Sequence, residues 1–160
     1  MRKLFILLFL LVALFISSSQ TYEQQSIVPT LQKWLPGKPF EEILSIFKIP
    51  YWGIIVSVEE RGYYYFVEFI IRKGAHFFFF GSIAAFIYSL LPRKSSRFTI
   101  AALLTLLIAI GDEYHQSLTG GRTPAVQDIM LDMAGALTAL FAIRIYLTLK
   151  NKRRRKKRTV

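Results

Sequence analysis

Hydrophobic residues along the chain gather in four long runs, and segments rich in polar, glycine or proline residues separate them. A helix needs about 20 apolar residues to cross the hydrocarbon core of a bilayer. Because the runs reach or approach this length, the pattern predicts four membrane-spanning helices. Their expected bounds are residues 4–21, 69–91, 98–116 and 124–149.

The first run has a second interpretation. Arg2 and Lys3 precede an apolar core over residues 4–16, and serines at 17–19 follow it. A charged start, a short apolar core and small polar residues are also typical of a cleaved signal peptide. Because further spans follow, we favour an uncleaved first helix. Both interpretations give the later spans the same orientation.

Residues 17–70 form a mixed connection between the first two predicted spans. Its apolar segment, residues 43–58, is interrupted by Lys48, Pro50 and Gly53, too often for a spanning helix. We therefore expect short helices that lie in the membrane interface, where aromatic side chains anchor such segments. The expected anchors are Trp34, Tyr51 and Trp52.

Composition supports a membrane protein. Hydrophobic residues make up 53% of the chain and the mean hydropathy is +0.39, which is too apolar for an ordinary soluble domain. The chain has no cysteine, so disulfides, thiolate chemistry and cysteine-bound metals are excluded. The predicted fold is an all-α polytopic membrane domain over residues 1–150, followed by a basic cytoplasmic tail over residues 151–160.

The formal net charge of +11 is concentrated near the carboxyl terminus. Eight basic residues lie between Lys150 and Arg158, and without them the net charge falls from +11 to +3. A basic cluster directly after an apolar helix indicates a cytoplasmic juxtamembrane segment rather than a nucleic-acid-binding surface. The 93–97 loop and the start of the chain are also basic, whereas the 17–70 connection, with four cations and six glutamates, has net charge −2. We therefore expect both termini in the cytoplasm.

Polar side chains interrupt the apolar pattern in two stretches, residues 72–76 and 111–132. Charge inside a membrane is costly and is retained mainly where it serves a function. The expected topology brings both stretches to the outer end of the helices. The candidate site residues are Arg72, Lys73, His76, Asp112, Glu113, His115, Gln116, Arg122, Asp128 and Asp132.

Helical spacing predicts which of these side chains share a face, because residues three or four apart are neighbours on a helix. One interpretation is an ion-pair network that holds the helix ends together, since charges inside membranes are usually paired. The other is a polar pocket for a headgroup, with Arg72, Lys73 and Arg122 on its cationic side. The expected neighbours are Arg72 with His76, Asp112 with His115 and Gln116, and Asp128 with Asp132.

Spacing gives little support to metal binding or catalysis. Histidine and carboxylate side chains are suitable zinc ligands, but Asp112 and Glu113 are adjacent and diverge by about 100° on a helix, and no H-E-x-x-H motif occurs. We therefore expect neither a metal nor another cofactor. No serine or cysteine lies in a nucleophile motif, so a hydrolase would need a histidine base and an attacking water.

Several motifs resemble the VanZ-like family of membrane proteins, and their order and spacing cover most of the chain. They are S-S-Q-x-Y-x-Q-Q at residues 18–25, R-K-x-A-H at 72–76, D-E-x-x-Q at 112–116, G-R at 121–122 and D-x-x-x-D-x-x-G at 128–135. One departure is Asp132, where many members have asparagine. By this resemblance, the residues that match the family's motif positions are Arg72, Lys73, His76, Asp112, Glu113, Gln116, Arg122, Asp128 and Gly135.

The resemblance implies a small bacterial multi-helix membrane protein, and the family's namesake is associated with low-level resistance to the glycopeptide teicoplanin. We therefore expect a plasma-membrane protein that binds a lipid or cell-wall-precursor headgroup at the outer leaflet and alters glycopeptide susceptibility. An anionic headgroup is the expected partner, and binding without catalysis the expected activity. The alternatives are an intramembrane hydrolase or transferase acting on a lipid-linked substrate, and a structural or assembly partner of another membrane protein.

Overall fold

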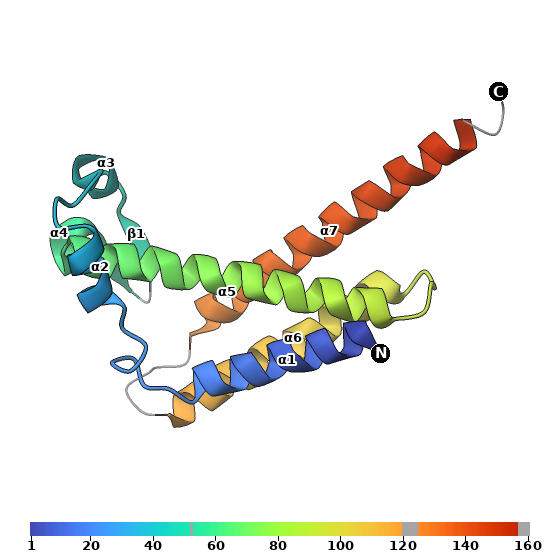
Figure 1. Cartoon of the computed structure of the whole chain (residues 1–160), viewed down its shortest axis with the longest axis horizontal. Helices are drawn as coiled ribbons and strands as arrows, with labels where there is room; N and C mark the ends of the chain where they lie inside the picture. The colour runs from blue at the N-terminus through green and yellow to red at the C-terminus, as the bar shows by residue number, and fades with distance from the viewer. Residues whose placement is uncertain (52, 120–124, 157–160) are drawn as a thin grey trace.

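The computed structural model describes residues 1–51, 53–119 and 125–156, and in this part of the chain the protein is mostly helical (Figure 1). Four long helices account for most of the molecule, and the short elements fall between the first two of them. The elements are α1 (Arg2–Ser18), α2 (Val28–Trp34), α3 (Glu41–Ser45), β1 (Ile49–Tyr51), β2 (Ile54–Val56), α4 (Val58–Arg61), α5 (Tyr63–Leu90), α6 (Arg97–Leu118) and α7 (Val126–Lys156).

Three of the described helices are long and apolar enough to cross a membrane: α5, α6, and α7 over Val126–Arg154. They indicate a multi-pass membrane protein. Helix α1 is apolar but has 17 residues, at the lower limit for a full crossing. The fourth span therefore stays a prediction.

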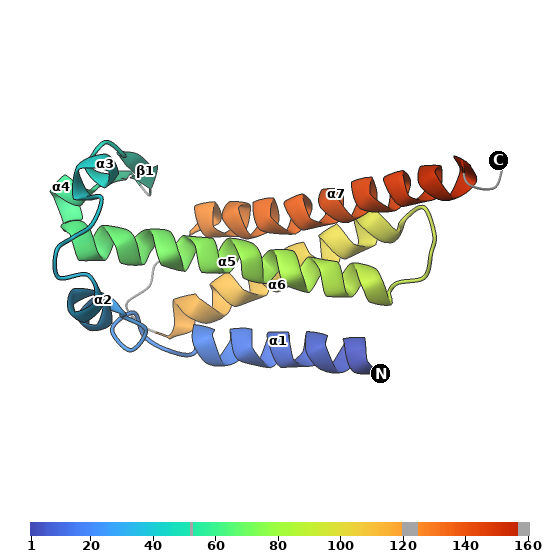
Figure 2. The same cartoon turned by 45° about the horizontal axis from the view of Figure 1, so that its top comes forward.

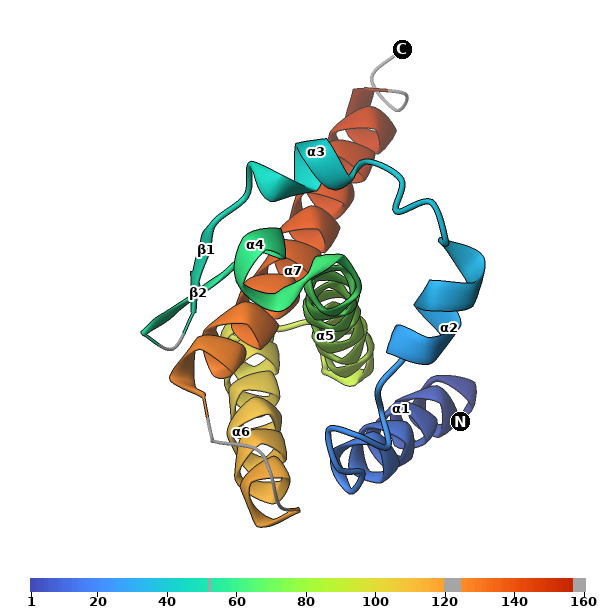
Figure 3. The ribbon, with the colours of Figure 1, turned by 90° about the vertical axis from the view of Figure 1, so that its left-hand side faces the viewer.

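Helix α5 is the central element of the bundle. It packs against α7, α6 and α1, and an end-on view places it among them (Figure 3). Apolar side chains of α1, among them Leu7, Leu11 and Leu14, pack against the core, so α1 is an integral wall of the fold. The core residues are Ile83, Ala84, Ile87, Ala101, Ala136 and Leu140.

Helices α5 and α7 approach each other closely at Gly135. A Cβ atom at this position would lie 2.7 Å from the carbonyl carbon of Phe77 and would overlap its oxygen. Gly81 continues the contact, since a Cβ there would lie 3.1 Å from the Gly135 carbonyl oxygen. Small residues allow helix backbones to approach in this way, and the approach fixes the first turns of α7 against α5.

The structure corrects the prediction that all regular structure is helical. Segment 43–58, expected to form short helices, begins with the last residues of α3 but continues as an antiparallel hairpin in which Ile49 pairs with Val56. Isoleucine and valine favour strands, and Gly53, with φ +70°, permits the turn. Val56 at the end of the hairpin is fully buried, so packing as well as local preference stabilises the hairpin.

Two helix bounds also differ from the predictions. Helix α5 begins at Tyr63 rather than at residue 69, because Tyr63 and Phe66 are buried against Val56 and Val58. Helix α7 continues past residue 149 to Lys156, and Lys and Arg are good helix formers in water. The predicted tail therefore begins as part of the helix.

The ends of the bundle differ in chemistry. At one end lie the carboxyl ends of α1 and α6 and the amino ends of α5 and α7, beside the hairpin and α2 to α4 (Figure 2). We call this the polar end. At the other lie the start of α1, the connection between α5 and α6, and the carboxyl end of α7 (Figure 2), which carry the basic segments. We call this the basic end.

Candidate functional site

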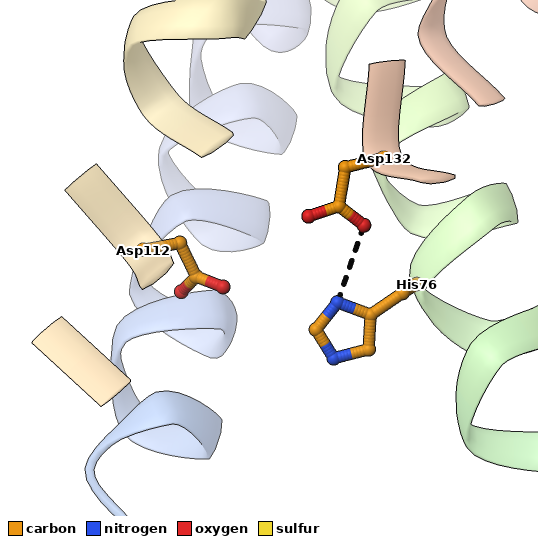
Figure 4. A group of neighbouring side chains, drawn as sticks. All are labelled: His76, Asp112 and Asp132. Carbon is orange, nitrogen blue, oxygen red and sulfur yellow. Dashed lines mark ion pairs between the residues drawn. The ribbon is translucent and has the colours of Figure 1, made fainter. Parts of the chain in front are cut away.

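Three helices contribute one side chain each to a cluster at the polar end, which we call the acid–histidine cluster: His76 from α5, Asp112 from α6 and Asp132 from α7. The three side chains point toward a common centre (Figure 4). Their nitrogen and carboxylate oxygen atoms lie within 4.8 Å of one another. The fold therefore joins residues from both polar stretches.

Within this cluster His76 and Asp132 form a pair. The Nδ1 atom of His76 lies 3.3 Å from Oδ1 of Asp132, whose side chain is only 3% exposed. That oxygen accepts no well-aligned hydrogen bond from the described part of the chain, so the contact with His76 is electrostatic. A buried carboxylate oxygen without a hydrogen bond is costly and indicates a site that can accept a further partner.

Both carboxylate oxygens of Asp112 accept hydrogen bonds, unlike Oδ1 of Asp132. The Ser18 hydroxyl at the end of α1 donates a hydrogen bond to one of its oxygens, and Gln116 Nε2 donates to the other at 2.6 Å. All three side chains are buried. Because Ser18 comes from α1, this contact joins the first helix to the site, and the predicted sharing of a face by Asp112 and Gln116 is confirmed.

A second group links α5, α7 and the hairpin. Lys73 and Asp128 form an ion pair, and the Tyr51 hydroxyl donates to the same Asp128 oxygen. The Lys73 ammonium lies 4.6 Å from the centre of the Tyr51 ring, a cation–π distance. Burial and then the bonded Asp128 carboxylate raise the pKa of Tyr51, so this phenol stays a hydrogen-bond donor at physiological pH. Tyr51, expected as an interfacial anchor, belongs to the site instead.

A third group surrounds Arg72. Its guanidinium donates to Gln25 at 3.1 Å and pairs with Glu68 at 3.5 Å, while its Cζ lies 4.4 Å from the centre of the Tyr22 ring. Glu68 also accepts from the Tyr22 hydroxyl at 3.1 Å and from the Ile27 backbone N–H at 2.7 Å. Burial, followed by the charge of Glu68, raises the pKa of Tyr22. This group ties the connection after α1 to α5.

The remaining acidic and histidine side chains have separate roles. Glu113 accepts a hydrogen bond from the backbone N–H of Ala125, the residue before α7. His115 faces α1, where its Nε2 lies 3.1 Å from the Ser19 hydroxyl and its ring meets Phe15 edge-on with centroids 4.5 Å apart. His115 therefore lies outside the acid–histidine cluster.

The predicted gathering of polar residues is found for the described residues, but one predicted pairing differs. Asp112 shares contacts with Gln116 and not with His115, because His115 turns toward α1. Arg72, expected on the cationic side of the site, pairs with Glu68 on its own helix. Arg122, expected on the cationic side, lies outside the described residues, as do Trp52 and the predicted start of the last span at residue 124.

Sequence reasoning missed some members of the site. Glu68 is almost fully buried, and its spacing of four from Arg72 within an apolar stretch was a usable signal. Tyr51 gave no local signal, because its contact with Asp128 joins residues 77 positions apart. Ser18 and Tyr22 belong to a motif already noted, but their partners are set by how α1 and α5 pack.

A small pocket opens beside the acid–histidine cluster. It has a volume of about 110 Å³, and its walls come from α1 and α5. Its lining is apolar apart from Ser17 and His76. The pocket therefore leads from the apolar flank of the bundle to the histidine. Its lining residues are Ala13, Leu14, Ser17, Ala75, His76 and Phe79.

Comparisons with known proteins place this architecture in a family. No curated protein and no solved structure matches the chain. The sequence profile of the VanZ/LLP1 family matches residues 3–147, from α1 through most of α7. The match includes His76, Asp112 and Asp132 as well as the groups around Lys73 and Arg72. The chain therefore belongs to the VanZ/LLP1 family.

Proposed function

We propose that this protein binds a phosphate-bearing headgroup, carried by a membrane lipid or a lipid-linked cell-wall precursor, at its polar end. The observation that carries the proposal is the pair of adjacent cations on α5, Arg72 and Lys73, whose side chains are each 19% exposed. Both are held in place by a carboxylate and an aromatic face. Positioned cations at the boundary of a membrane are suited to a phosphate group.

Arg72 keeps binding capacity in this arrangement. A guanidinium has five N–H donors, and the contacts of Arg72 with Gln25 and Glu68 in the described part of the chain use two of its nitrogens. Its planar geometry suits two-point contact with phosphate oxygens, which the compact ammonium of a lysine cannot reproduce. Lys73 would add a point charge on the adjacent position. Together the two side chains offer directional hydrogen bonds and positive charge to one phosphate.

The flanks of the bundle offer space for the acyl chain of such a lipid. The 110 Å³ pocket reaches His76 between α1 and α5. Nearer the basic end, a second pocket of about 480 Å³ lies between α1, α5 and α6. Its lining is entirely aliphatic: Leu7, Ile87, Leu90, Leu91, Leu104, Leu107 and Ile108.

The distribution of basic residues indicates which side of the membrane the polar end faces. The basic segments lie together at the basic end, and basic residues are enriched on the cytoplasmic side of membrane proteins. With α1 as a fourth span, both termini are cytoplasmic and the polar end faces the outer leaflet of the bacterial plasma membrane. A protein that holds precursor headgroups there would alter glycopeptide susceptibility. The effect on glycopeptide susceptibility is tested by measuring teicoplanin susceptibility in cells that express either the wild type or Arg72→Lys at equal levels.

A second candidate function is an intramembrane hydrolase or transferase acting on a lipid-linked substrate. The pairing of His76 with Asp132, beside Asp112, favours it, because a carboxylate can orient a histidine that activates water. The two functions respond differently to substitution. Loss of His76 would abolish hydrolysis, whereas headgroup binding through Arg72 and Lys73 would persist in His76→Gln.

Native mass spectrometry of the purified protein tests headgroup binding directly. The measured quantity is co-purified phosphate-bearing lipid per folded chain, for wild type and Arg72→Lys. The matched control is Arg97→Lys at the basic end, where Arg97 donates to the Tyr88 carbonyl and stacks on the Tyr88 ring. All three proteins carry the same charge.

We expect wild type and Arg97→Lys to retain lipid equally and Arg72→Lys to lose most of it. The lysine keeps the charge but not the two-point geometry. Equal occupancy in all three proteins would contradict the headgroup site and leave an ion-pair network that only joins the helices. The masses of the retained lipids would distinguish a phospholipid from a cell-wall precursor.

A further inference from the structure

We propose that the acid–histidine cluster is a binding site for one divalent transition-metal ion, of the Zn²⁺ or Mn²⁺ class. The ligands would be His76, Asp112 and Asp132, one from each of the three membrane-spanning helices. This site is distinct from the proposed headgroup contacts of Arg72 and Lys73 and does not depend on them.

The geometry is close to that of a coordination shell. The nitrogen and oxygen donors of the three residues lie within 4.8 Å of one another. Donors bound at about 2.1 Å to one ion lie at most about 4.2 Å apart, so small rotations of the side chains complete the set. The three side chains already point toward one centre (Figure 4).

The two carboxylates of the cluster carry more negative charge than its histidine can neutralise. Asp112 and Asp132 are both buried, and the imidazole of His76 can offset at most one of the two negative charges. Lys73, three residues before His76 on α5, is already paired with Asp128. Two carboxylates in a poorly solvated site repel each other unless a proton or a cation lies between them. A divalent ion would neutralise both while His76 binds as a neutral ligand.

Asp132 supplies an independent observation. Its side chain is 3% exposed, and its Oδ1 atom, which faces His76 inside the cluster (Figure 4), accepts no well-aligned hydrogen bond from the described residues. Buried polar atoms in native proteins nearly always have a partner. A metal ion at the centre would satisfy this oxygen, which the 3.3 Å contact with His76 Nδ1 does not.

Neighbouring contacts support the ligands as metal sites require. Hydrogen bonds from Ser18 and Gln116 orient the Asp112 carboxylate, and such outer contacts hold ligands in place in metal sites. Asp132 is positioned by the close approach of α7 to α5 at Gly135, three residues further along α7. The Asp112 carboxylate and the backbone at Asp132 are therefore positioned before an ion enters.

The donor set indicates the class of ion. One imidazole nitrogen and two carboxylates suit Zn²⁺ and Mn²⁺ better than thiophilic metals or Ca²⁺. Three protein ligands leave at least one coordination position for water or for an oxygen of a ligand. The 110 Å³ pocket, which His76 helps to line, lies next to the site.

Metal binding can be measured on the purified full chain without any knowledge of its activity. The protein is prepared without an affinity tag, treated with chelator, and titrated with Zn²⁺ and separately with Mn²⁺ by calorimetry. Elemental analysis then gives bound metal per folded chain. The variants are His76→Gln and Asp132→Asn, and the chain offers matched controls for both. His115→Gln removes its only other histidine, and Asp128→Asn removes a carboxylate one turn away on α7.

We expect one ion per chain in wild type and in both controls, and at least a tenfold loss of affinity in His76→Gln and Asp132→Asn. The ion should also raise the unfolding temperature of wild type but not of those two variants. Failure of wild type to bind either ion would overturn the site, as would equal loss in His115→Gln or Asp128→Asn. If Asp132→Asn does not fold, the comparison of His76→Gln with His115→Gln still tests whether His76 binds the ion.

Discussion

At the scale of single residues, Gly135 determines whether the polar residues of α5 and α7 can meet. A side chain there would overlap the Phe77 carbonyl oxygen, so the helices could not keep their present separation. Asp128 and Asp132 precede Gly135 by two turns and by one turn, and they face Lys73 and His76. The spacing D-x-x-x-D-x-x-G thus combines two carboxylates with the contact that positions them.

Gly135→Ala should destabilise the protein in detergent by about 1–3 kcal/mol, the usual cost of overpacking. The measurement is reversible unfolding in a denaturing detergent or, where unfolding is irreversible, the thermal midpoint. Gly111→Ala on α6 is the control, because a Cβ there meets nothing within 4 Å. Alanine favours helix over glycine, so Gly111→Ala should be neutral or stabilising. Equal effects of the two substitutions would show that the approach at Gly135 is not tight.

Residue identity made part of the site predictable. A histidine, several carboxylates and basic residues inside apolar runs could be recognised as functional candidates from the cost of charge in a membrane. Helical spacing also predicted the contact of Asp112 with Gln116. Helical spacing could not predict that Asp132, rather than Glu113, would lie beside His76 and Asp112, because this arrangement depends on how three helices pack.

At the scale of elements, the ion pair of Lys73 with Asp128 couples α5 to α7. Both side chains are about one-fifth exposed, at 19% and 20%, and Tyr51 of the hairpin donates to the same carboxylate. Removing one partner leaves a poorly solvated charge alone, which costs more than the pair itself contributes. The pair therefore joins α5, α7 and the hairpin.

A double-mutant cycle of Lys73→Met and Asp128→Asn should give a coupling energy of about 1–3 kcal/mol in detergent unfolding. The double variant should be less destabilised than the sum of the single variants. The pair of Lys38 with Glu41, whose side chains are 45% and 39% exposed, is a solvated control and should couple by less than about 1 kcal/mol. Additive effects at Lys73 and Asp128 would mean that their contact contributes nothing.

The long elements could be predicted and the hairpin could not. Apolar runs of near-spanning length identified α5, α6 and α7, and Pro92 marks the end of α5 because the residue before a proline disfavours helix. The eight residues from Ile49 to Val56 are ambiguous by periodicity alone. Their strand pairing is stabilised by burial of Val56 against Tyr63 and Phe66, a contact that local sequence does not contain.

At the scale of the whole molecule, chemistry is divided between the two ends. The basic segments lie at one end and the acid–histidine cluster, with the groups around Lys73 and Arg72, at the other (Figure 2). Short elements between α1 and α5 accompany the polar end. This division predicts an orientation in the membrane, because the end rich in lysine and arginine is retained in the cytoplasm.

Because the chain has no cysteine, single cysteines can report this orientation. We expect an impermeant thiol reagent to label Gln24→Cys and Ser117→Cys on intact cells. Lys94→Cys and Lys152→Cys should be labelled only after the membrane is permeabilised. Labelling of Lys94→Cys but not of Ser117→Cys would reverse the orientation and move the site to the inner leaflet.

Headgroup binding requires direct contact between Arg72 and a phosphate at the polar end. Solid-state NMR of the protein in bilayers can measure this contact through dipolar coupling between guanidinium ¹⁵N and lipid ³¹P. Arginines near both ends contribute to the signal, so the informative quantity is the part that a substitution removes. We predict that Arg72→Lys removes a close ¹⁵N–³¹P coupling that persists in Arg97→Lys. A coupling unchanged by Arg72→Lys would contradict the headgroup site.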